Sequence, residues 1–368
     1  MTDYLSYLIL GFSLLQLLVA MANLLFKERL PLKREQSVET SNIRESVSVL
    51  IPARDEETNI NLLLKDLTRV IDSIKEIIVC DDQSSDQTAA VVSRYANEYP
   101  QVHLIHSEHL PDGWSGKNHA CHLLSQKACG DYLLFLDADV RIDEGHIERS
   151  LVYMQKRNCD LMSIFPSQEM QTLGEKMTVP NMMTILLTLL PLPLVLRSHY
   201  PSLSAANGQF MLFKRNTYAE FLPHERFKAS RAEDIDIAHF LKKQQKRVSC
   251  LTGIDTVRCR MYHSVKEALN GFSKNVACFF GNSSIIAVFY WLITTFGFII
   301  FPISGNYGML WIWICATVIS RVSVSLTAHI NVFESLLLLL PQQLMLGVII
   351  GYSVTSKKKK IIWKGRKV

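Results

Sequence analysis

The 368-residue sequence lacks the patterns that define several classes of protein. Its eight cysteines are scattered, with no C-x-x-C pair and no spacing typical of metal ligands, and a disulfide framework would be unusual in a chain of this length. The sequence has no internal repeat, no nucleic-acid-binding motif and no low-complexity segment except a short run of lysines near its C-terminus. These absences argue against a disulfide-stabilised domain, a cysteine-ligated metal site and a nucleic-acid partner, and they predict reduced cysteines.

Long apolar runs are instead concentrated at the two ends of the chain. Residues 4–26 are almost entirely apolar and are long enough to cross a bilayer at about 1.5 Å per residue. A cleaved secretory signal has positive charge before its apolar run, whereas here Asp3 precedes the run and Lys27 and Arg29 follow it. This asymmetry predicts an uncleaved anchor, residues 1–28, whose C-terminal end lies in the cytoplasm.

A second apolar region, residues 284–353, is predicted to be a C-terminal transmembrane region. It contains three candidate spans, near residues 284–303, 309–330 and 333–353. Three crossings after a cytoplasmic domain would leave the basic tail, residues 354–368, outside the cell, against the tendency of positive charge to stay inside. The middle span carries Arg321 and His329, so we expect that segment not to cross. The lysines of the tail are better explained by anionic lipid than by nucleic acid.

A shorter apolar stretch, residues 177–196, contains prolines at positions 180, 191 and 193. Because proline interrupts helical hydrogen bonding, a helix along the membrane interface is favoured over a crossing. A crossing by this stretch would add one span and would also bring the basic tail back to the cytoplasmic side. It is therefore the alternative to the expectation that residues 309–330 do not cross.

Between the apolar ends, residues 46–265 alternate short apolar strands with helical patterns. The strands are predicted at residues 46–52, 76–80, 102–106, 132–136 and 161–165, and the helices at 56–74, from 86 onward and at 118–128. Continuous apolar strands separated by helices are typical of an α/β fold with a mostly parallel sheet covered on both faces. Ligands of such sheets bind at the carboxyl ends of the strands.

Acidic residues follow two of these strands. Asp81 and Asp82 end the second strand, and Asp137 and Asp139 follow the fourth in the sequence L-D-A-D. Two carboxylates one residue apart can bind a hard divalent cation and leave coordination positions for a diphosphate. The cation would offset the charge that develops on a leaving nucleoside diphosphate. The alternative for D-x-D alone is an Asx turn at the strand end.

Three further motifs occur in the predicted α/β region. P-A-R-D-E-E at 52–57 follows the first strand, G-W-S-G-K at 113–117 precedes a helix, and A-E-D-I-D at 232–236 opens another helix. A glycine-flanked lysine at a helix start fits phosphate binding but also fits a simple turn and cap. Acids at a helix start are commonly favourable caps.

Taken together and in this order, the motifs resemble those of the family 2 glycosyltransferases, whose catalytic domain has the GT-A fold. The resemblance covers residues 46–265 and implies a nucleotide-sugar as partner. The donor-binding residues that it implies are Ala53, Glu56, Asp82, Lys117 and Asp137. It also implies that Asp137 and Asp139 bind a divalent metal, Mg²⁺ or Mn²⁺, and that Asp234 is the catalytic base. A carboxylate base suits an inverting transfer, because the acceptor hydroxyl must be deprotonated opposite the leaving group. Trp114, Glu233, Arg258 and Arg260 are candidates for contact with the acceptor or a phosphate.

Two departures from the family pattern refine this interpretation. Asp55 stands where the family usually has Asn, and the Q-x-x-R-W motif of polymer-making members is absent, because residues 257–262 read V-R-C-R-M-Y. The motifs G-W-S-G-K, R-M-Y, G-F-S-K-N and W-K-G-R together resemble a membrane-bound subgroup. That subgroup includes bacterial carotenoid (diaponeurosporenoate) glucosyltransferases and hopanoid-associated glycosyltransferases.

The resemblance therefore implies an inverting enzyme that moves one hexose, glucose from UDP-glucose, onto a membrane-embedded lipid such as a carotenoid acid. The alternative acceptors are a polyprenyl phosphate, a hopanoid or a glycerolipid. A non-catalytic nucleotide-sugar-binding membrane protein is a further alternative, although the retained acids argue against it. A transporter is disfavoured by the few apolar spans. We expect a multi-pass protein of the cell membrane with a cytoplasmic catalytic domain.

Overall fold

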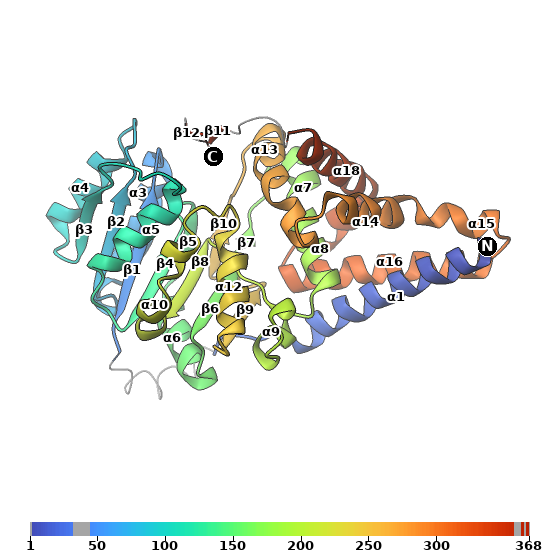
Figure 1. Cartoon of the computed structure of the whole chain (residues 1–368), viewed down its shortest axis with the longest axis horizontal. Coiled ribbons are helices and arrows are strands. Elements are labelled where there is room, and N and C mark those ends of the chain that lie inside the picture. The colour runs from blue at the N-terminus through green and yellow to red at the C-terminus, as the bar shows by residue number, and fades with distance from the viewer. Residues whose placement is uncertain (1, 32–44, 357–361, 364–365, 368) are drawn as a thin grey trace.

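The computed structural model describes residues 2–31, 45–356, 362–363 and 366–367. The predicted lysine cluster at 357–360 lies outside these ranges. The chain forms an α/β unit, and apolar helices from both ends of the sequence project together from one side of it (Figure 1). This arrangement confirms the predicted α/β fold with apolar helices at the N-terminus and in the C-terminal region.

A seven-stranded sheet with strand order β3-β2-β1-β4-β8-β6-β9 forms the centre of the α/β unit. Its strands are β1 (Val47–Ala53), β2 (Glu76–Asp81), β3 (Val102–His106), β4 (Tyr132–Leu136), β6 (Leu161–Phe165), β8 (Phe210–Lys214) and β9 (Val248–Thr252). Among the described strands of this sheet, only β8 runs antiparallel to its neighbours, which are β4 and β6. The mostly parallel sheet and its first five predicted strands are confirmed, whereas the sequence analysis missed β8 and β9.

Helices cover both faces of this sheet. They are α3 (Glu57–Thr68), α4 (Thr88–Glu98) and α6 (His146–Arg157) on one face, and α5 (Gly116–Lys127), α10 (Arg215–Phe221) and α12 (Glu233–Lys243) on the other. Because both faces are covered, the strands are apolar at almost every position rather than at alternate ones.

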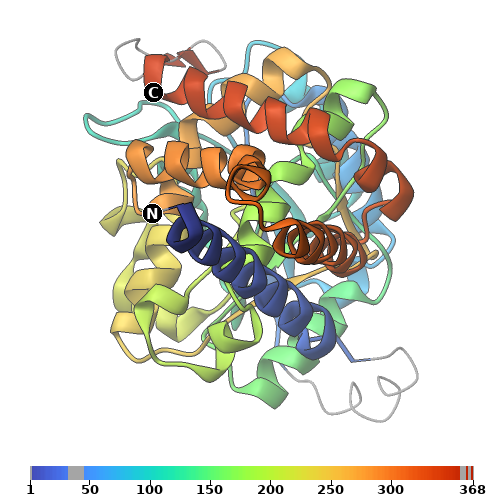
Figure 2. The same cartoon turned by 90° about the vertical axis from the view of Figure 1, so that its right-hand side faces the viewer.

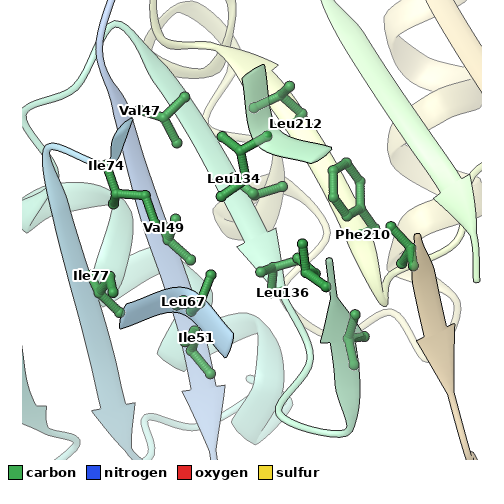
Figure 3. Packing of buried hydrophobic residues seen from close by; sticks show 14 of the residues in the cluster. Val47, Val49, Ile51, Leu67, Ile74, Ile77, Leu134, Leu136, Phe210 and Leu212 are labelled. Atoms are coloured by element: carbon green, nitrogen blue, oxygen red, sulfur yellow. The ribbon is translucent and has the colours of Figure 1, made fainter. Parts of the chain in front are cut away.

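One half of the core lies between β1, β4 and the first group of helices. Figure 3 shows Val47, Val49 and Ile51 of β1 on the same face as Leu134 and Leu136 of β4, as the alternation of side chains along a strand requires. All five side chains are fully buried. Burying an aliphatic side chain of this size contributes about 1.5–3 kcal/mol. These contacts therefore stabilise β1 and β4, the strands from which two loops of the site begin.

A small second sheet lies beside the acidic loop that follows β4. It contains β5 (Val140–Ile142), β10 (Val257–Cys259) and β7 (Ser167–Gln168), with β10 in the middle. The register pairs Cys259 with Val140, which directly follows Asp139. Segments far apart in the sequence therefore meet at the second aspartate of the D-x-D motif.

The proline-containing stretch at 177–196 forms short helices that end near the prolines. These are α7 (Leu173–Thr178), α8 (Pro180–Leu189) and α9 (Pro193–Arg197). Pro180 and Pro193 occupy first helical positions, where a missing N–H has no cost. Nδ2 of Asn23 donates to the carbonyl oxygens of Leu187 and Leu190, both at 2.9 Å, which fixes the end of α8 against the N-terminal helix. The interfacial position of this stretch stays a prediction.

Three stretches of helix in the described chain are long and apolar enough to cross a membrane. They are α1 (Thr2–Phe26), the 20 residues Ser284–Ile303 that contain α14 (Ser284–Phe296) and α15 (Ile300–Ile303), and α16 (Tyr307–Ala328). The final apolar segment is divided into α17 (Val332–Leu337) and α18 (Leu339–Ser356). In Figure 2, α18 runs across the view, whereas α16 is seen nearly end-on.

These helix lengths bear on one expectation from the sequence without testing it. The stretch at 309–330, which we expected not to cross, forms the 22-residue helix α16 and is one of the three candidate spans. The stretch at 333–353 is not among them, because its apolar helix, Leu339–Thr355, is shorter. Arg321, the charge on which the expectation rested, is buried inside the helix bundle (4% exposed), so it does not by itself exclude a crossing.

Glu28, two residues after the end of α1, has a buried carboxylate. Its Oε2 lies 2.7 Å from Nη2 of Arg157 in α6, and its Oε1 lies 3.4 Å from Nη2 of Arg197 in α9. The hydroxyl of Tyr153 also donates to Oε2, at 3.5 Å. These contacts fix the end of α1 to the α/β unit.

Candidate active site

The acids predicted at strand ends lie at one edge of the sheet, because β1, β2 and β4 are parallel neighbours. Ala53 pairs with Asp81 in the ladder, and the backbone N–H of Asp82 donates to the carbonyl of Ala53 at 2.8 Å. Asp137 and Asp139 follow β4 at the same edge. The structure therefore brings together the loops in which we expected the chemistry.

The loops after β1 and β2 are joined by hydrogen bonds. Nη1 of Arg54 donates to the carbonyl of Asp82 at 2.5 Å, and the backbone N–H of Glu56 donates to Oγ1 of Thr88 at 2.8 Å. Asp55 has a φ of 51°, in the left-handed region that Asn and Asp adopt more readily than other residues except glycine. Aspartate in place of the usual asparagine is therefore compatible with this loop.

The ammonium group of Lys117 lies at the centre of the site. Its Nζ is 2.8 and 2.9 Å from the two carboxylate oxygens of Asp137, and 3.4 Å from Oε1 of Glu233. Burial favours the neutral amine, but the carboxylates of Asp137 and Glu233 raise the pKa of Lys117 well above its usual range. Lys117 is therefore a positive charge held at the end of β4, where a donor diphosphate is expected.

Gly208, in the loop before β8, approaches this cluster more closely than a larger residue could. A Cβ atom at Gly208 would lie 2.9 Å from Nζ of Lys117 and 3.2 Å from Oε1 of Glu233. Its carbonyl oxygen lies 3.5 Å from the same Nζ. The sequence analysis missed this residue. The available signal was a glycine just before a strand, in A-N-G-Q-F, which marks close approach of the backbone to another group.

Asp234 lies in the first turn of α12, next to Glu233. Its Oδ2 accepts a hydrogen bond from the backbone N–H of Gly208 at 2.9 Å, and its Oδ1 accepts one from the N–H of Ile235 at 2.9 Å. Burial raises the pKa of Asp234, although Lys117 and these two N–H groups oppose the shift. Burial also raises the pKa of Glu233 to about 7. A carboxylate with a raised pKa and a fixed orientation has the properties of a general base.

The second aspartate of the A-E-D-I-D motif has a different environment. Oδ2 of Asp236 accepts a hydrogen bond from the hydroxyl of Ser230 at 2.6 Å. Of these two aspartates, Asp234 is the one that joins the Lys117 cluster.

Asp139 has an incompletely satisfied carboxylate. Its Oδ1 is buried and has no hydrogen-bond partner among the described residues. Burial, together with the charges of Asp137 and Glu56, raises the pKa of Asp139 to about 7. A divalent cation would relieve both the missing partner and the repulsion between acids. No group of three or more His, Cys, Asp or Glu side chains in the described chain is arranged to hold a metal. The residues therefore fit an open site that the donor phosphates would complete.

Cys259 and Gln209 border the D-x-D loop and were also missed from the sequence. Nε2 of Gln209 lies 2.8 Å from Sγ of Cys259, and the backbone N–H of Asp137 donates to the carbonyl of Gln209 at 3.2 Å. Burial raises the pKa of Cys259 well above its usual range, with Asp139 adding to the shift. The thiol is therefore neutral and supports the loop rather than acting as a nucleophile.

Trp114 lies just before α5 and contacts several polar side chains. Its ring centre is 5.4 Å from that of His119 and 5.2 Å from that of His122. Nζ of Lys228 lies 5.9 Å from the ring centre, and the carbonyl of Lys228 accepts a hydrogen bond from the N–H of Ser115 at 2.7 Å. The G-W-S-G-K loop is thereby joined to the segment before α12, and contact of Trp114 with the acceptor stays a prediction.

Arg258 and Arg260 each form ion pairs in the described structure. Nη2 of Arg258 lies 2.8 Å from Oδ1 of Asp143, and Nη2 of Arg260 lies 2.9 Å from Oε1 of Glu175. Glu175 is fully buried and forms the capping box of α7. Burial favours its neutral form, but Arg260 and the backbone N–H of Gln171 lower the pKa of Glu175 to about 2. Both arginines thus have structural partners, and contact with a phosphate or acceptor stays a prediction.

Comparison with known proteins supports the interpretation of these loops. The sequence profile of the glycosyl transferase family 2 matches residues 48–221. A 4,4'-diaponeurosporenoate glycosyltransferase from Staphylococcus haemolyticus is 27% identical over 243 residues, which are 63% of this chain and 61% of that protein. A protein of the same description from Staphylococcus aureus (strain USA300) is 30% identical over 151 residues, 40% of this chain and 38% of that protein. The alignments therefore span less than two thirds of the length of either relative.

A solved structure extends the comparison to the whole chain. A mannosyltransferase from Pyrobaculum calidifontis, in complex with GDP-Man and Mn²⁺, superposes with a TM-score of 0.58 and 15% identity. The superposition covers 97% of this chain and all of the other (100%). At this identity the similarity is one of fold, and it confirms the GT-A fold expected from the sequence motifs.

Proposed function

The chain belongs to the glycosyl transferase family 2, and from this premise we propose that it transfers a single hexose from a nucleotide-sugar to a membrane-embedded lipid acceptor. Our specific proposal is an inverting transfer of glucose from UDP-glucose to a carotenoid acid or a similar apolar acceptor. The observation that carries it is the cluster of Lys117, Asp137 and Asp234 at the carboxyl edge of the sheet, beside helices long enough to cross a membrane.

The donor side of the proposal rests on the loops after β1, β2 and β4. We assign the nucleoside to Ala53, Glu56 and Asp82, whose backbones are hydrogen-bonded to one another or to the adjacent loop. We assign the diphosphate to Lys117, because a retained positive charge near the acids suits a phosphate. The mannosyltransferase with the same fold was solved with GDP-Man, which supports a nucleotide-sugar as the class of donor.

Asp137 and Asp139 are the residues that would hold a divalent metal, Mg²⁺ or Mn²⁺. When bound, such an ion supplies charge stabilisation for the departing nucleoside diphosphate. The buried, unpartnered Oδ1 of Asp139 is the feature of this chain that suits the ion. In the described structure Lys117 occupies both oxygens of Asp137, so Asp139 provides the carboxylate oxygen that remains available.

Asp234 is the proposed catalytic base. Its carboxylate is oriented by the N–H groups of Gly208 and Ile235, and burial raises its pKa toward the range in which a base is effective. It would accept the proton of an acceptor hydroxyl as the oxygen attacks the sugar. An acceptor that is already a carboxylate needs no such step, because it is ionised at neutral pH.

The acceptor proposal rests on the apolar helices and on the relatives. Both relatives are described as 4,4'-diaponeurosporenoate glycosyltransferases, which supports an apolar acid as acceptor. Helices α7 to α9 lie between the α/β unit and the apolar helices (Figure 1), where an acceptor from the bilayer would reach the sheet edge. A soluble acceptor would not require this arrangement.

The proposed orientation places the α/β unit in the cytoplasm. Oγ of Ser6 lies 2.9 Å from Oγ of Ser304, so the start of α1 and the turn before α16 lie at the same end of the helix bundle. At the opposite end, Nζ of Lys27 lies 3.3 Å from Nε2 of His329. If α1, Ser284–Ile303 and α16 are the three crossings, the α/β unit and the end of α16 lie on the same side of the membrane. The basic C-terminal tail then follows on the cytoplasmic side, which agrees with the positive-inside tendency.

The decisive experiment identifies the labelled product. Membranes that contain the protein are incubated with radiolabelled UDP-glucose, UDP-N-acetylglucosamine or GDP-mannose, and lipids are then extracted and identified by mass spectrometry. We expect label from UDP-glucose in an apolar lipid. Label in a polyprenyl phosphate, hopanoid or glycerolipid would replace the carotenoid acid as acceptor. Absence of lipid label with every donor, while nucleotide-sugar still binds, would favour the non-catalytic alternative.

A further inference from the structure

A cavity of about 240 Å³ lies inside the helix bundle, away from the Lys117 cluster. Its lining comes from α1, α8, α14, the 3-10 helix Gly297–Ile299, α16 and α18. Apart from one arginine, it consists of hydroxyl, amide, aromatic and aliphatic side chains. One lining residue, Arg321 of α16, carries a charge, and no acidic residue lines the cavity among the described residues. A mostly apolar cavity with one buried positive charge is not explained by packing alone.

Arg321 has few partners for a buried guanidinium. It is 4% exposed, and Nη1 donates to Oγ1 of Thr184 at 2.7 Å. Among the described residues this guanidinium makes no other hydrogen bond and no ion pair, and it interacts electrostatically with the side chain of Tyr290. A guanidinium has five N–H donors and remains charged in proteins. A buried charge without a counter-ion is unfavourable, and within membrane helices such residues commonly mark functional sites.

Two further residues that line the cavity have unsatisfied polar atoms. Nε1 of Trp313 and Oγ of Ser320 are buried without a hydrogen-bond partner among the described residues. The hydroxyls of Thr184 and Thr188, in contrast, donate to carbonyl oxygens one turn earlier in α8. The lining therefore has N–H and O–H donors without acceptors, which suits a ligand that provides negatively charged oxygen atoms.

The cavity also borders the outer surface of the bundle. Phe298 and Leu340 line it and are 40% and 59% exposed, respectively. Its volume is slightly below the roughly 300–1,000 Å³ of typical small-molecule pockets, so it suits a headgroup with the first part of a tail. The rest of an apolar tail would extend past these two side chains into the bilayer.

We propose that this cavity binds the anionic headgroup, a carboxylate or a phosphate, of a membrane amphiphile, with Arg321 as its counter-ion. Trp313 and Ser320 would donate the accompanying hydrogen bonds. The site lies within the helices and is independent of the proposed transfer reaction, because binding needs neither a donor nor Asp234.

The test measures binding to the full-length protein in a non-ionic detergent. Oleate and dioleoyl phosphatidic acid are added separately, with oleyl alcohol and dioleoylglycerol as neutral counterparts of the same tails. We expect an anionic probe to raise Tm by about 2 °C or more and to give one bound molecule by native mass spectrometry. A response to oleate alone identifies a carboxylate site, and a response to phosphatidic acid identifies a phosphate site.

Two variants decide whether the response belongs to the cavity. Arg321→Met should abolish the rise in Tm, and Thr317→Leu, which fills the cavity but keeps the arginine, should do the same even if Arg321→Met fails to fold. Val318→Leu is the matched control, because it adds bulk on an exposed part of α16 (38% exposed) and should leave the response unchanged. Equal shifts with the neutral amphiphiles, no shift with either anionic one, or a full shift in Thr317→Leu would overturn the proposal.

Discussion

The carboxylate of Asp234 is held by the backbone of Gly208, through a 2.9 Å hydrogen bond from N–H to Oδ2. Because Gly208 has no side chain, Nζ of Lys117 can lie close to its backbone. A Cβ atom at this position would lie 2.9 Å from that Nζ. One backbone position thus orients the candidate base and admits the candidate phosphate-binding lysine. Separate substitutions of Gly208 and Asp234 can therefore distinguish the effect on the lysine from the effect on the base.

Gly208→Ala should impair the site more than the fold. The added Cβ would displace the end of the flexible Lys117 side chain, and we expect kcat/KM to fall roughly tenfold or more, equivalent to about 1.4 kcal/mol or more in transition-state stabilisation. Gly308→Ala is the control, because a Cβ there meets no atom within 4 Å. The measurement compares kcat/KM and Tm for both variants with the wild type. A fall in Tm without a change in kcat/KM would assign Gly208 a role in folding only.

Asp234→Asn should preserve donor binding and reduce transfer. The substitution keeps the shape of the side chain but removes its basicity, so kcat on a hydroxyl acceptor should fall by about 10²–10⁴. Transfer to a carboxylate acceptor should be less sensitive, because that acceptor is already ionised. Asp236→Asn is the matched control, since Asp236 bonds Ser230 instead. Two results would show that Asp234 is not the base. One is normal turnover of Asp234→Asn on a hydroxyl acceptor, and the other is a higher donor Kd with an unchanged kcat.

Asp139→Ala should remove most activity and the dependence on added Mn²⁺ or Mg²⁺. The variant loses the buried Oδ1 that we assign to the cation. Calorimetry of Mn²⁺ binding in the presence of UDP gives a second measurement that does not require turnover, and its affinity should fall as well. Undiminished turnover of the wild type after treatment with a chelator would contradict the assignment.

The ion pair of Glu175 should make stability depend on acid pH. The pKa of this carboxyl is lowered from 4.5 to about 2, so its contribution is fully present above about pH 4.5 and is lost as pH falls toward 2. Glu175→Gln lacks that contribution at every pH. The difference in Tm between wild type and variant should therefore be largest near neutral pH and should narrow below pH 4.5. A constant difference across this range would mean that the charge of Glu175 does not stabilise the fold.

A reporter fused after residue 30 should report the cytoplasm. Nucleotide-sugars are made in the cytoplasm, and Lys27 and Arg29 follow the apolar run on that side. A second reporter at Gly305, in the turn between α15 and α16, should report the opposite side. The same side for both reporters would rule out three crossings, and an external signal at residue 30 would overturn the orientation.

The sheet could be predicted because its strands are buried on both faces and therefore appear as continuous apolar runs. The edge on which the acids lie followed from the parallel order of β1, β2 and β4. Strand β8 was not predictable in the same way, because its antiparallel position between β4 and β6 depends on partners distant in the sequence. The same reason explains the missed contact between Gly208 and Asp234.

The helix bundle was harder to predict than the sheet. Hydropathy identifies apolar stretches but does not distinguish a charge that faces lipid from one that faces a cavity. The expectation that α16 does not cross rested on Arg321, whose side chain is enclosed by neighbouring helices, and that expectation stays a prediction. The division of the last apolar segment into α17 and α18 also depends on tertiary packing, since Glu334 of α17 pairs with Lys176 of α7 at 2.6 Å.

The buried carboxylate of Glu28 has a consequence for how the enzyme works at a bilayer. Its pairs with Arg157 and Arg197, together with the hydrogen bonds from Asn23 to the end of α8, attach the N-terminal helix to the α/β unit at several points. A shortened protein beginning at residue 45 would leave these arginines without their counter-charge. In the proposed orientation, these contacts would keep the candidate active site at a fixed distance from the bilayer surface, and a lipid acceptor would have to leave the bilayer partly to reach it.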